Sequence, residues 1–312
     1  MIDIIKYDAT KKDEWDSFIK QSKNGTFLFY RNYMDYHADR FEDFSLLFYE
    51  GSRLIAVLPA SKHGFQICSH GGLTYGGFVS GPKMTTSLML QCFEAMAKFM
   101  TSNCINELLY KRIPYIYYQY PSDEDLYALF RNGAALVRRD ISTCIYQPDS
   151  IEFSSRRLRN IKKAISAAVK VEKNNDFAGY FKLLADVLHE RHQAVAVHTA
   201  DEMLYLAAAY PDNIHLFCAY ADNDMVAGVL VYETPMVAHT QYLANSVVGR
   251  NIGALDAIID FLVKHQYKNK PFFDFGTSNE DNGRILNENL AVQKQEFGGR
   301  GVIHDFYQIN FV

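Results

Sequence analysis

Hydrophobic and polar positions alternate along the chain with two different periods, and the periods change in a recognisable order. Residues 44–50 and 53–60 show the two-residue alternation of strands on either side of a Glu-Gly-Ser turn, which predicts a hairpin. The elements expected after this hairpin are a glycine-rich turn at 69–82, a helix at 85–100, a strand at 107–119, a helix at 123–133 and a strand at 140–146. Two further helices are expected before the hairpin, at 13–20 and 30–41.

The same order returns in the second part of the chain. The elements expected there are strands at 214–221, 225–234 and 237–247, a glycine turn at 249–254, a helix at 254–265, a strand at 272–275, a helix at 284–296 and a strand at 302–311. This repetition predicts an α+β protein of two tandem domains, each with a mixed, largely antiparallel sheet flanked by helices. Pro148 and a pair of serines interrupt the pattern, so the domains are expected at 1–148 and 149–312.

Composition narrows the class of protein. The hydrophobic share of 48% in 312 residues is enough for proper cores and excludes a disordered or fibrous chain. The net charge of -4 provides no global positive field, so contact with nucleic acid would need a local patch. Five scattered cysteines without a Cys-x-x-Cys pair favour reduced thiols in a cytoplasm. We expect neither a signal peptide nor a membrane span, and therefore a cytoplasmic protein.

The segment 154–169 has no counterpart in the first half. Ser154 or Ser155 can cap a helix there, and one face of that helix is apolar. The remaining positions carry the cations Arg156, Arg157, Arg159, Lys162 and Lys163. Cations in the first turns oppose the helix dipole, and a nearby anion would offset that cost. The segment therefore indicates either a solvated cationic face or an anion-binding surface.

Several short stretches resemble the FemABX family of aminoacyl and acyl transferases. They are the basic stretch 157–164, the turn Leu-Thr-Tyr-Gly-Gly-Phe-Val-Ser-Gly-Pro at 73–82, the Phe-Asp-Phe-Gly strand at 273–276, and the tail Lys-x-x-Phe-Gly formed by Lys294, Phe297 and Gly298. That family is built from two GNAT folds in tandem. The resemblance therefore implies two tandem GNAT-like domains, and it implies transfer of an acyl group to an amine. The long helical hairpin that some cell-wall members insert in the second half is absent from this sequence.

The resemblance implies that the acyl donor binds to the second domain, with the first domain mainly a scaffold on the acceptor side. The GNAT diphosphate turn, Gln/Arg-x-x-Gly-x-Gly/Ala, lies between a strand and a helix, whose first N–H groups can bind phosphate. The corresponding residues are Arg250, Asn251, Ile252, Gly253 and Ala254. Acetyl-CoA or another acyl-CoA is the donor that this turn implies, with no metal. The alternative is a turn that only connects two elements.

Transfer also requires a base for the attacking amine. Glu233, at the end of a strand, and His239, on the next strand, are the candidates. Two-residue alternation would place His239, Gln241 and Asn245 on one face, with Gln241 at the substrate. The alternative for each is an ordinary polar residue on a sheet face.

Two further residues take their expected roles from the resemblance. Lys294 is expected near the acyl centre, where it stabilises negative charge, and Asp274 is expected to help form the acceptor pocket. The alternatives are a surface lysine and an ordinary buried carboxylate. His198 precedes a helix and is expected to line the acceptor cleft, unless it is only a loop residue. His189 and His192 lack the four-residue spacing and the third ligand of a zinc motif, so we expect no metal site.

These observations predict a cytoplasmic N-acyltransferase. We expect it to move an acyl group, most simply acetyl, from acyl-CoA to an amine of a phosphorylated or nucleotide-linked sugar or a cell-envelope precursor. Arg156, Arg159 and Lys163 are expected to bind that anionic acceptor at a cleft between the domains. The alternatives are a FemX-type transferase that uses aminoacyl-tRNA, which the net charge disfavours, and a non-catalytic binding protein. No stable protein partner is expected.

Overall fold

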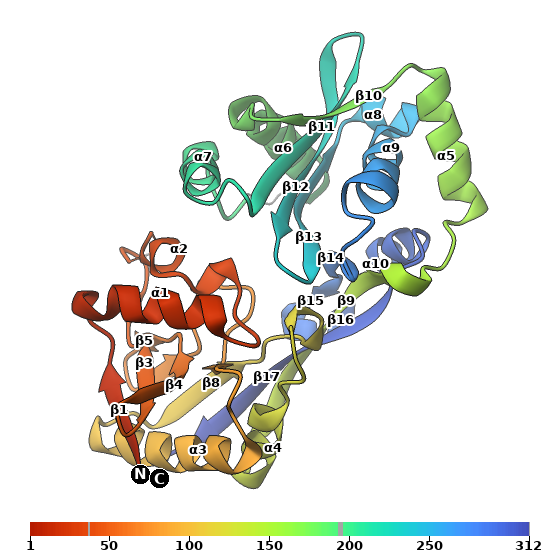
Figure 1. The fold of residues 1–312 in the computed structure, drawn as a ribbon. Helices are drawn as coiled ribbons and strands as arrows, with labels where there is room; N and C mark the ends of the chain where they lie inside the picture. The colour runs from red at the N-terminus through yellow and green to blue at the C-terminus, as the bar shows by residue number, and fades with distance from the viewer. Residues whose placement is uncertain (37, 193–195, 312) are drawn as a thin grey trace. The chain divides into compact units, whose positions relative to one another are not determined.

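The computed structural model describes residues 1–36, 38–192 and 196–311, except for the side chains of residues 191 and 192. The chain forms two compact units (Figure 1). Unit 1 comprises Met1–Ile141, Asn279–Ile285 and Ile303–Val312, and unit 2 comprises Ser142–Ser278 and Leu286–Val302. Both units are discontinuous in sequence, unlike the contiguous domains 1–148 and 149–312 expected above. The reason is that the strands β9 (Ala135–Tyr146) and β17 (Arg300–Asn310) each pass from one unit into the other.

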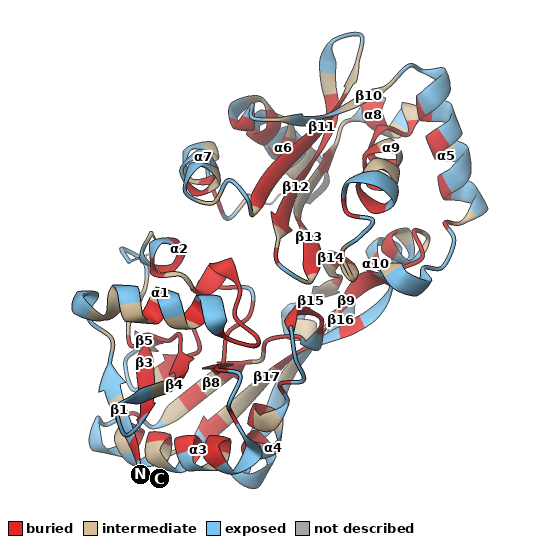
Figure 2. Cartoon of the chain, in the orientation of Figure 1, coloured by how far each residue is buried: buried red, intermediate tan, exposed pale blue. Residues whose placement is uncertain are grey.

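Unit 1 contains one four-stranded sheet with the order β1-β3-β4-β7 and a second group of strands, β2, β5, β6 and β8, beside its parts of β9 and β17. The bounds are β1 (Ile2–Lys6), β2 (Glu42–Asp43), β3 (Leu46–Glu50), β4 (Arg53–Leu58), β5 (Ser61–His63), β6 (Gln66–Cys68), β7 (Val79–Ser80) and β8 (Glu107–Lys111). Its helices are α1 (Lys12–Gln21), α2 (Arg31–Asp35), α3 (Thr86–Ser102) and α4 (Glu124–Arg131). The apolar face of α3 packs into one core with the β3–β4 hairpin (Figure 2).

Unit 2 contains a mixed sheet with the order β10-β11-β12-β13-β14-β9-β17, in which β13 and β14 are parallel. The bounds are β10 (Lys170–Asn174), β11 (Ile214–Ala221), β12 (Asp224–Glu233), β13 (Val237–Asn245) and β14 (Phe272–Thr277). Its helices are α5 (Ser155–Ser166), α6 (Phe177–His192), α7 (Ala200–Ala209), α8 (Val247–Ile252), α9 (Ala254–Phe261), continued by a π-helical turn at Leu262–Gln266, and α10 (Glu288–Gln295). Two short strands, β15 (Asn279–Glu280) and β16 (Ile285–Leu286), pair with each other.

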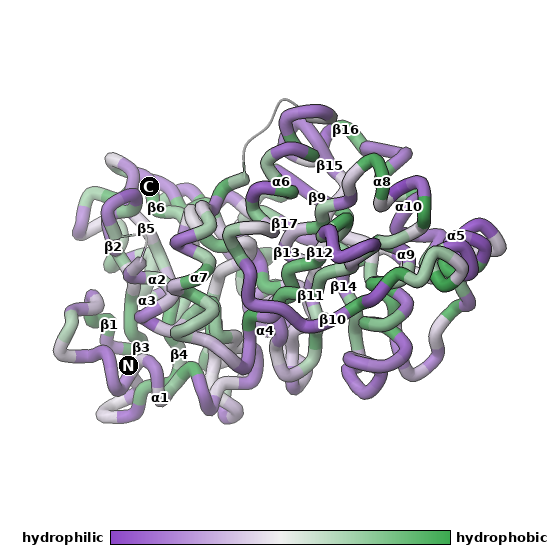
Figure 3. Tube along the Cα trace, turned by 90° about the horizontal axis from the view of Figure 1, so that it is seen from above, coloured by the Kyte–Doolittle hydropathy of each residue, from purple (hydrophilic) through white to green (hydrophobic). Residues whose placement is uncertain are grey.

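Helices cover both faces of the β11–β12–β13 region. Ile258 and Ile259 of α9 join Val229 of β12 in the core of one face. The preceding residue of β12, Gly228, points to the other face, where a Cβ atom would stand 2.6 Å from the ring of Tyr180 on α6. This face therefore needs a glycine so that α6 can pack against the sheet. β11 and β12 lie between these helices in Figure 2 and carry hydrophobic, green stretches in the hydropathy view of Figure 3.

Two expected elements end earlier than the pattern indicated. The helix expected at 30–41 is limited to Arg31–Asp35, and residue 37 lies outside the described residues. The strand expected at 107–119 ends at Lys111, and a 3-10 turn at Tyr115–Tyr117 follows Pro114. Proline has no N–H to donate to a neighbouring strand, which accounts for the end of pairing there. No helix in the described part of the chain is both long and apolar enough to cross a membrane.

Candidate active site

The sheet of unit 2 opens where two parallel strands part. β13 and β14 pair at three positions, of which the last joins His239 to Asp274. β13 continues to Asn245 and β14 to Thr277, but beyond His239 and Asp274 they no longer pair with each other. An opening flanked by two strand ends is a place where a ligand can reach backbone and side chains inside a sheet.

A β-bulge in β13 decides which side chains face this opening. Val231 of β12 pairs with Thr240 and Leu230 pairs with Tyr242, so Gln241 has no partner on β12. The extra residue reverses the alternation, so that Asn245 shares a face with Thr240 rather than with His239. The expected common face of His239, Gln241 and Asn245 is therefore wrong. A bulge has no reliable mark in a single sequence, and regular alternation could not predict it.

A cavity of about 380 Å³ lies at the opening. Its polar lining consists of Arg156, Arg157 and Asn160 of α5, Asn245 of β13, Arg250 of α8, Asp256 of α9, and Gln293 and Lys294 of α10. Its apolar lining consists of Val187, Leu243, Leu255, Ile259, Phe275, Leu290 and Phe297. Val187 belongs to α6 and Ile259 to α9, the helices on opposite faces of the sheet. The cavity is therefore accessible to side chains from both faces.

Arg157 of α5 lines the cavity and contacts residues of both α9 and α10. Its Nη1 lies 3.0 Å from Oδ1 of Asp256 and its Nη2 lies 2.9 Å from Oε2 of Glu296. Nη2 also donates to the carbonyl oxygen of Gln293, and the guanidinium stacks 4.6 Å from the centre of the Phe297 ring. This buried charge is therefore neutralised by two carboxylates. Sequence reasoning did not select Arg157 for the site, although its position four residues before Ile161 places it on the buried face of α5.

Two other arginines leave positive charge at the cavity. Arg156 is largely exposed and its Nε lies 3.6 Å from Glu296, a carboxylate that Arg157 already holds. Arg250 donates to the carbonyl oxygen of Asn245, and it makes no ion pair with the residues that the structure describes. Both side chains are suited to bind an anionic part of a ligand.

Lys294 is buried and is one of the residues that line the cavity. Its Nζ donates to the carbonyl oxygens of Gly276 at 2.8 Å and Thr277 at 2.7 Å, both beyond the last position at which β14 pairs with β13. Burial lowers the pKa of Lys294 to about 8, although the charge of Asp274 acts in the opposite direction. An ammonium has three N–H groups, so one remains for a ligand in the cavity.

His239 and Asp274 form a hydrogen-bonded pair at the apex of the opening. Nδ1 of His239 lies 2.7 Å from Oδ2 of Asp274, and the hydroxyl of Ser142 on β9 donates to Oδ1 of the same carboxylate. Asp274 is completely buried. Gly276 has φ of +75°, and a Cβ atom there would stand 3.2 Å from Cε1 of His239. The imidazole is therefore confined between the carboxylate and the backbone at Gly276.

The expected diphosphate turn at 250–254 has a different structure. Residues up to Ile252 form the short helix α8, whose N-cap is Ser246, and Gly253 joins it to α9 in the left-handed region with φ of +76°. A Cβ atom at Gly253 would overlap the backbone carbonyl of Asn160 on α5. The first turn of α9 already holds a carboxylate, that of Asp256, bound by Arg157 and Asn160. The glycine thus serves close packing of α5 against α9, and the expected strand-to-helix loop is wrong.

The other expected residues lie apart from the cavity lining. Glu233 pairs with Lys270 at 2.8 Å and His215 at 3.3 Å; burial raises its pKa, but hydrogen bonds from these two partners outweigh burial and lower it. Nδ1 of His198 lies 2.7 Å from the hydroxyl of Tyr242. The cavity lining includes neither Arg159 nor Lys163, which are exposed on α5. Of the residues expected from sequence, Arg156, Arg250 and Lys294 are the ones that meet at the cavity.

No group of three His, Cys, Asp or Glu side chains suited to a metal ion occurs in the described parts of the chain. The side chain of His192 lies outside the described residues, so the pair that it forms in sequence with His189 is not tested.

Unit 1 repeats the parallel strand pair but closes its opening. β6 and β8 also pair at three positions, the last joining Cys68 to Leu109. The chain after β6 then stays on β8, because the N–H groups of Ser69 and Gly76 donate to the carbonyls of Leu109 and Lys111. Nζ of Lys111 donates to the carbonyl oxygens of His70 and Leu73 in this segment. Backbone fills the space that is open in unit 2.

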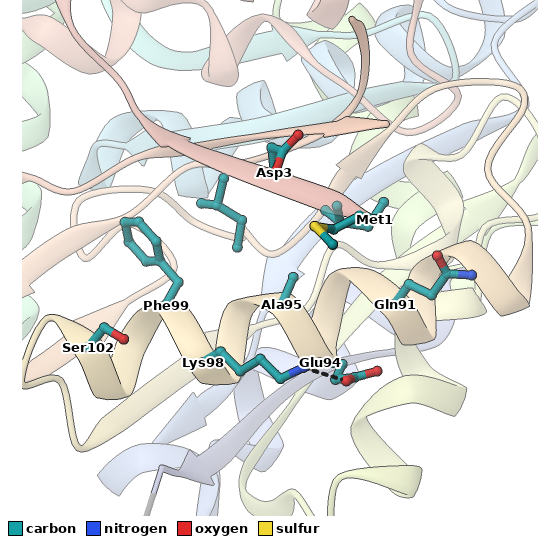
Figure 4. A pocket seen from close by; sticks show the side chains of 10 residues that line it. Met1, Asp3, Gln91, Glu94, Ala95, Lys98, Phe99 and Ser102 are labelled. Atoms are coloured by element: carbon teal, nitrogen blue, oxygen red, sulfur yellow. Dashed lines mark hydrogen bonds and ion pairs between the residues drawn. The ribbon is translucent and has the colours of Figure 1, made fainter. Parts of the chain in front are cut away.

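Unit 1 has a cavity elsewhere, between β1 and α3 (Figure 4). Its side chains include Asp3, Gln91 and Phe99, and Lys98 and Glu94 pair with each other across one turn of α3. The exposed pair Lys98–Glu94 lies within one helix, and the remaining charged side chain among those that line this cavity is Asp3. The candidate active site is therefore the one in unit 2.

The fold is that of tandem GNAT proteins. Searches against protein-family models and against curated proteins find no match for this sequence. Among solved structures, FemX superposes with a TM-score of 0.68 at 11% identity, over 97% of this chain and 96% of FemX. The C-terminal domain of a putative lysylphosphatidylglycerol synthetase from Agrobacterium fabrum gives 0.61 at 10% identity, over 97% and 92%. A tandem GNAT protein from the clavulanic acid biosynthesis pathway gives 0.50 at 8% identity, over 100% and 99%.

At these identities the likeness shows the fold. It confirms the α+β architecture of two tandem GNAT-like domains, and it agrees with the FemABX resemblance drawn from sequence.

Proposed function

We propose that this protein transfers an acyl group from an activated donor, bound in the cavity of unit 2, to an amine. The observation that carries this proposal is the position of Lys294. Its buried ammonium lies at the opening between β13 and β14, bound to two carbonyl oxygens and with one N–H directed to neither. A fixed hydrogen-bond donor in a site with little water stabilises the oxyanion that forms when an amine attacks an ester or thioester.

The charges around the cavity suit a donor that has an anionic part. Arg156 and Arg250 carry positive charge that the described carboxylates do not fully neutralise. Their guanidinium groups would bind phosphate, while Leu243, Phe275 and Ile259 offer an apolar surface to the acyl group. This division of the cavity would orient the carbonyl carbon towards Lys294.

Two donor classes fit this chemistry, an acyl-CoA and an aminoacyl-tRNA. The packing of Gly253 against Asn160 favours a donor whose phosphates are bound by side chains, because the backbone at 250–254 is not available as a phosphate loop. An aminoacyl ester meets this condition most easily. The exposed cations of α5, at Arg159, Lys162 and Lys163, would supply the local positive patch that RNA requires in a chain of net charge -4.

Acyl-CoA is the second candidate donor, and the observation in its favour is the opening itself. Separated parallel strands leave β13 backbone from Gln241 onwards without a partner on β14, where an extended pantetheine arm could lie. In this case Arg250 would bind the diphosphate by its side chain.

The test compares donor consumption. Purified protein is mixed with radiolabelled acetyl-CoA or with tRNA charged with labelled amino acids, and with a panel of amines that includes nucleotide-linked amino sugars. We expect amine-dependent loss of label from one donor, lost in Lys294→Met and retained in Lys268→Met, which removes an exposed lysine of the same unit away from the cavity and from α5. Equal rates with and without protein for every donor would overturn the proposal.

A further inference from the structure

We propose that His239, oriented by Asp274, is the catalytic base that takes the proton from the attacking amine. This inference rests on the proposed function, because a base has a role only if an amine attacks at this opening. His239 is not among the residues that line the cavity; it adjoins the cavity through Gly276, whose carbonyl accepts from Lys294. It adds a residue and a direction of approach that Lys294 and the arginines do not provide.

The hydrogen bonds to Asp274 fix the tautomer of His239. A buried carboxylate that already accepts from Ser142 is an acceptor, so Nδ1 of His239 carries the proton in the 2.7 Å contact with Oδ2. Nε2 of the neutral ring is then the atom with a free lone pair. A neighbouring carboxylate also stabilises the imidazolium that forms when Nε2 accepts a proton.

The position of His239 places this lone pair at the apex of the opening. His239 and Asp274 form the last pair between β13 and β14, so the ring lies beside the stretch where these two strands no longer pair with each other. Its Cε1 edge faces Gly276, and Nε2 would be 4.0 Å from a Cβ atom at that glycine. The carbonyl of the same glycine accepts from Lys294, which lines the cavity. His239 and Lys294 therefore converge on one residue of β14.

The two groups approach this residue from different sides. His239 pairs with Tyr232 of β12. Tyr232 is two positions from Leu230 and four from Gly228, and residues an even number apart on a strand point to the same face. Tyr232 therefore lies on the α6 face, as Gly228 does. Leu243 and Asn245 lie on the α9 face with the arginine-lined part of the cavity. Val187 of α6 also lines the cavity, so the cavity reaches the α6 face. The amine is thus expected to enter from the α6 side and the donor from the α9 side.

Among the titratable groups that the structure describes around His239, Asp274 is the carboxylate in contact with the ring. Asp274 lies on β14 and Tyr232 on β12, where the Tyr232 hydroxyl donates to the sulfur of Met203. Cys144 on β9 is opposite Asp274 in the ladder, and burial raises the pKa of its thiol, so the thiol stays neutral. Lys294 on α10 is separated from the ring by Gly276. Asp274 is therefore the carboxylate that orients the ring of His239.

The transfer moves one proton from the attacking amine to the leaving atom. The amine nitrogen attacks the carbonyl carbon and forms the C–N bond, and the carbonyl oxygen takes the electron pair beside Lys294. Nε2 of His239 takes one proton from that nitrogen. Collapse of the intermediate breaks the bond between the carbonyl carbon and the leaving oxygen or sulfur, and the imidazolium returns its proton to that leaving atom.

The kinetic test uses the donor and amine that the wild-type protein consumes. For His239→Gln we expect kcat to fall by about 10²- to 10⁴-fold with little change in KM, and the acid limb of the pH–rate profile to disappear. For Asp274→Asn we expect a smaller loss and a displaced acid limb. His265→Gln, which changes an exposed histidine of the same unit, is the control and should match the wild type.

A second measurement reads the orientation of the ring without any donor. In nitrogen NMR of the resting protein, Nδ1 of His239 should carry the proton and Nε2 should not, and Asp274→Asn should disturb this pattern while leaving the folded spectrum intact. A proton on Nε2 in the neutral wild-type ring would overturn the proposal.

The two proposals fail in different ways. Turnover with an unchanged pH profile in His239→Gln would overturn the role of His239 and leave the transferase function in place. No turnover with any donor would overturn both.

Discussion

The backbone carbonyl of Asn160 occupies the space that a Cβ atom at Gly253 would need. The two residues belong to α5 and to the start of α9, and this contact sets how closely the helices approach. It also explains why a glycine that resembles part of a phosphate loop is required for packing in this chain. The cavity beside this contact is lined by the side chains of Arg156, Arg157 and Arg250.

Replacing Gly253 by alanine should destabilise the protein strongly. The new methyl group would overlap backbone of α5, and φ of +76° adds the cost of a left-handed residue, together about 2–4 kcal/mol in the free energy of unfolding. Urea denaturation measures this change. Gly133→Ala is the matched control, because Gly133 has φ of +66° with open space around its Cβ position, and it should lose only about 1 kcal/mol. Equal losses for both variants would contradict the packing role.

Arg157 and its two carboxylates should behave as one buried unit. In Arg157→Met, Asp256 and Glu296 would lose their buried partner, and we expect a loss of about 3–5 kcal/mol in unfolding free energy. Arg159→Met, two residues further along α5 and exposed, should change stability by less than about 0.5 kcal/mol. A double-mutant cycle with Asp256→Asn should show coupling, and purely additive losses would argue against the network.

Lys111 should make the stability of the protein rise with pH in a defined window. Burial lowers its pKa to about 8 in the folded protein, whereas the unfolded chain retains the ordinary value of 10.5. Between these values the unfolded state binds more protons, so the free energy of unfolding increases with pH, by up to about 1.4 kcal/mol per unit.

The measurement for Lys111 is the difference in unfolding free energy between the wild type and Lys111→Met, at pH values from 7 to 10 by urea denaturation. The difference should change in favour of the wild type above about pH 8. Lys98→Met, at an exposed position on α3, should show no such trend. A difference that is constant with pH would show that burial does not lower the pKa of Lys111 below its value in the unfolded chain.

Lys294 should set the alkaline limit of transfer. In the proposed reaction its ammonium would stabilise the oxyanion only while it is protonated, and its pKa is lowered to about 8 by burial. We therefore expect kcat to fall as the pH rises through about 8. Lys294→Met should lose about 10²- to 10³-fold in kcat at pH 7, and Lys294→Arg should move the alkaline limb upwards in whatever activity remains. An alkaline limb that stays in Lys294→Met would assign it to another group.

Much of the architecture could be predicted from the pattern of residues. The strand expected at 214–221 coincides with β11, and the hairpins and the order of elements in both halves follow from local alternation and turn residues. Lys294 and Arg250 could be selected because their surrounding motifs are local in sequence, and both line the cavity.

Other features depend on contacts between distant residues. The pairing of Arg157 with Asp256 joins residues far apart in the chain, and no local pattern marks either as a partner. Glu233 shows the reverse case, because a strand-end carboxylate that looked available as a base is held by Lys270 and His215.

The sequence by itself determined the duplicated α+β fold, because periodic burial and turn chemistry are local properties that each segment carries with it. Only the tertiary structure decided which of the two units has an opening between its parallel strands. The parallel pair β13–β14 separates after His239 and Asp274, while the corresponding pair in unit 1 is filled by its own glycine-rich segment. That difference arises from which backbone groups find partners across long sequence separations, and such pairing is settled only when the whole sheet has formed.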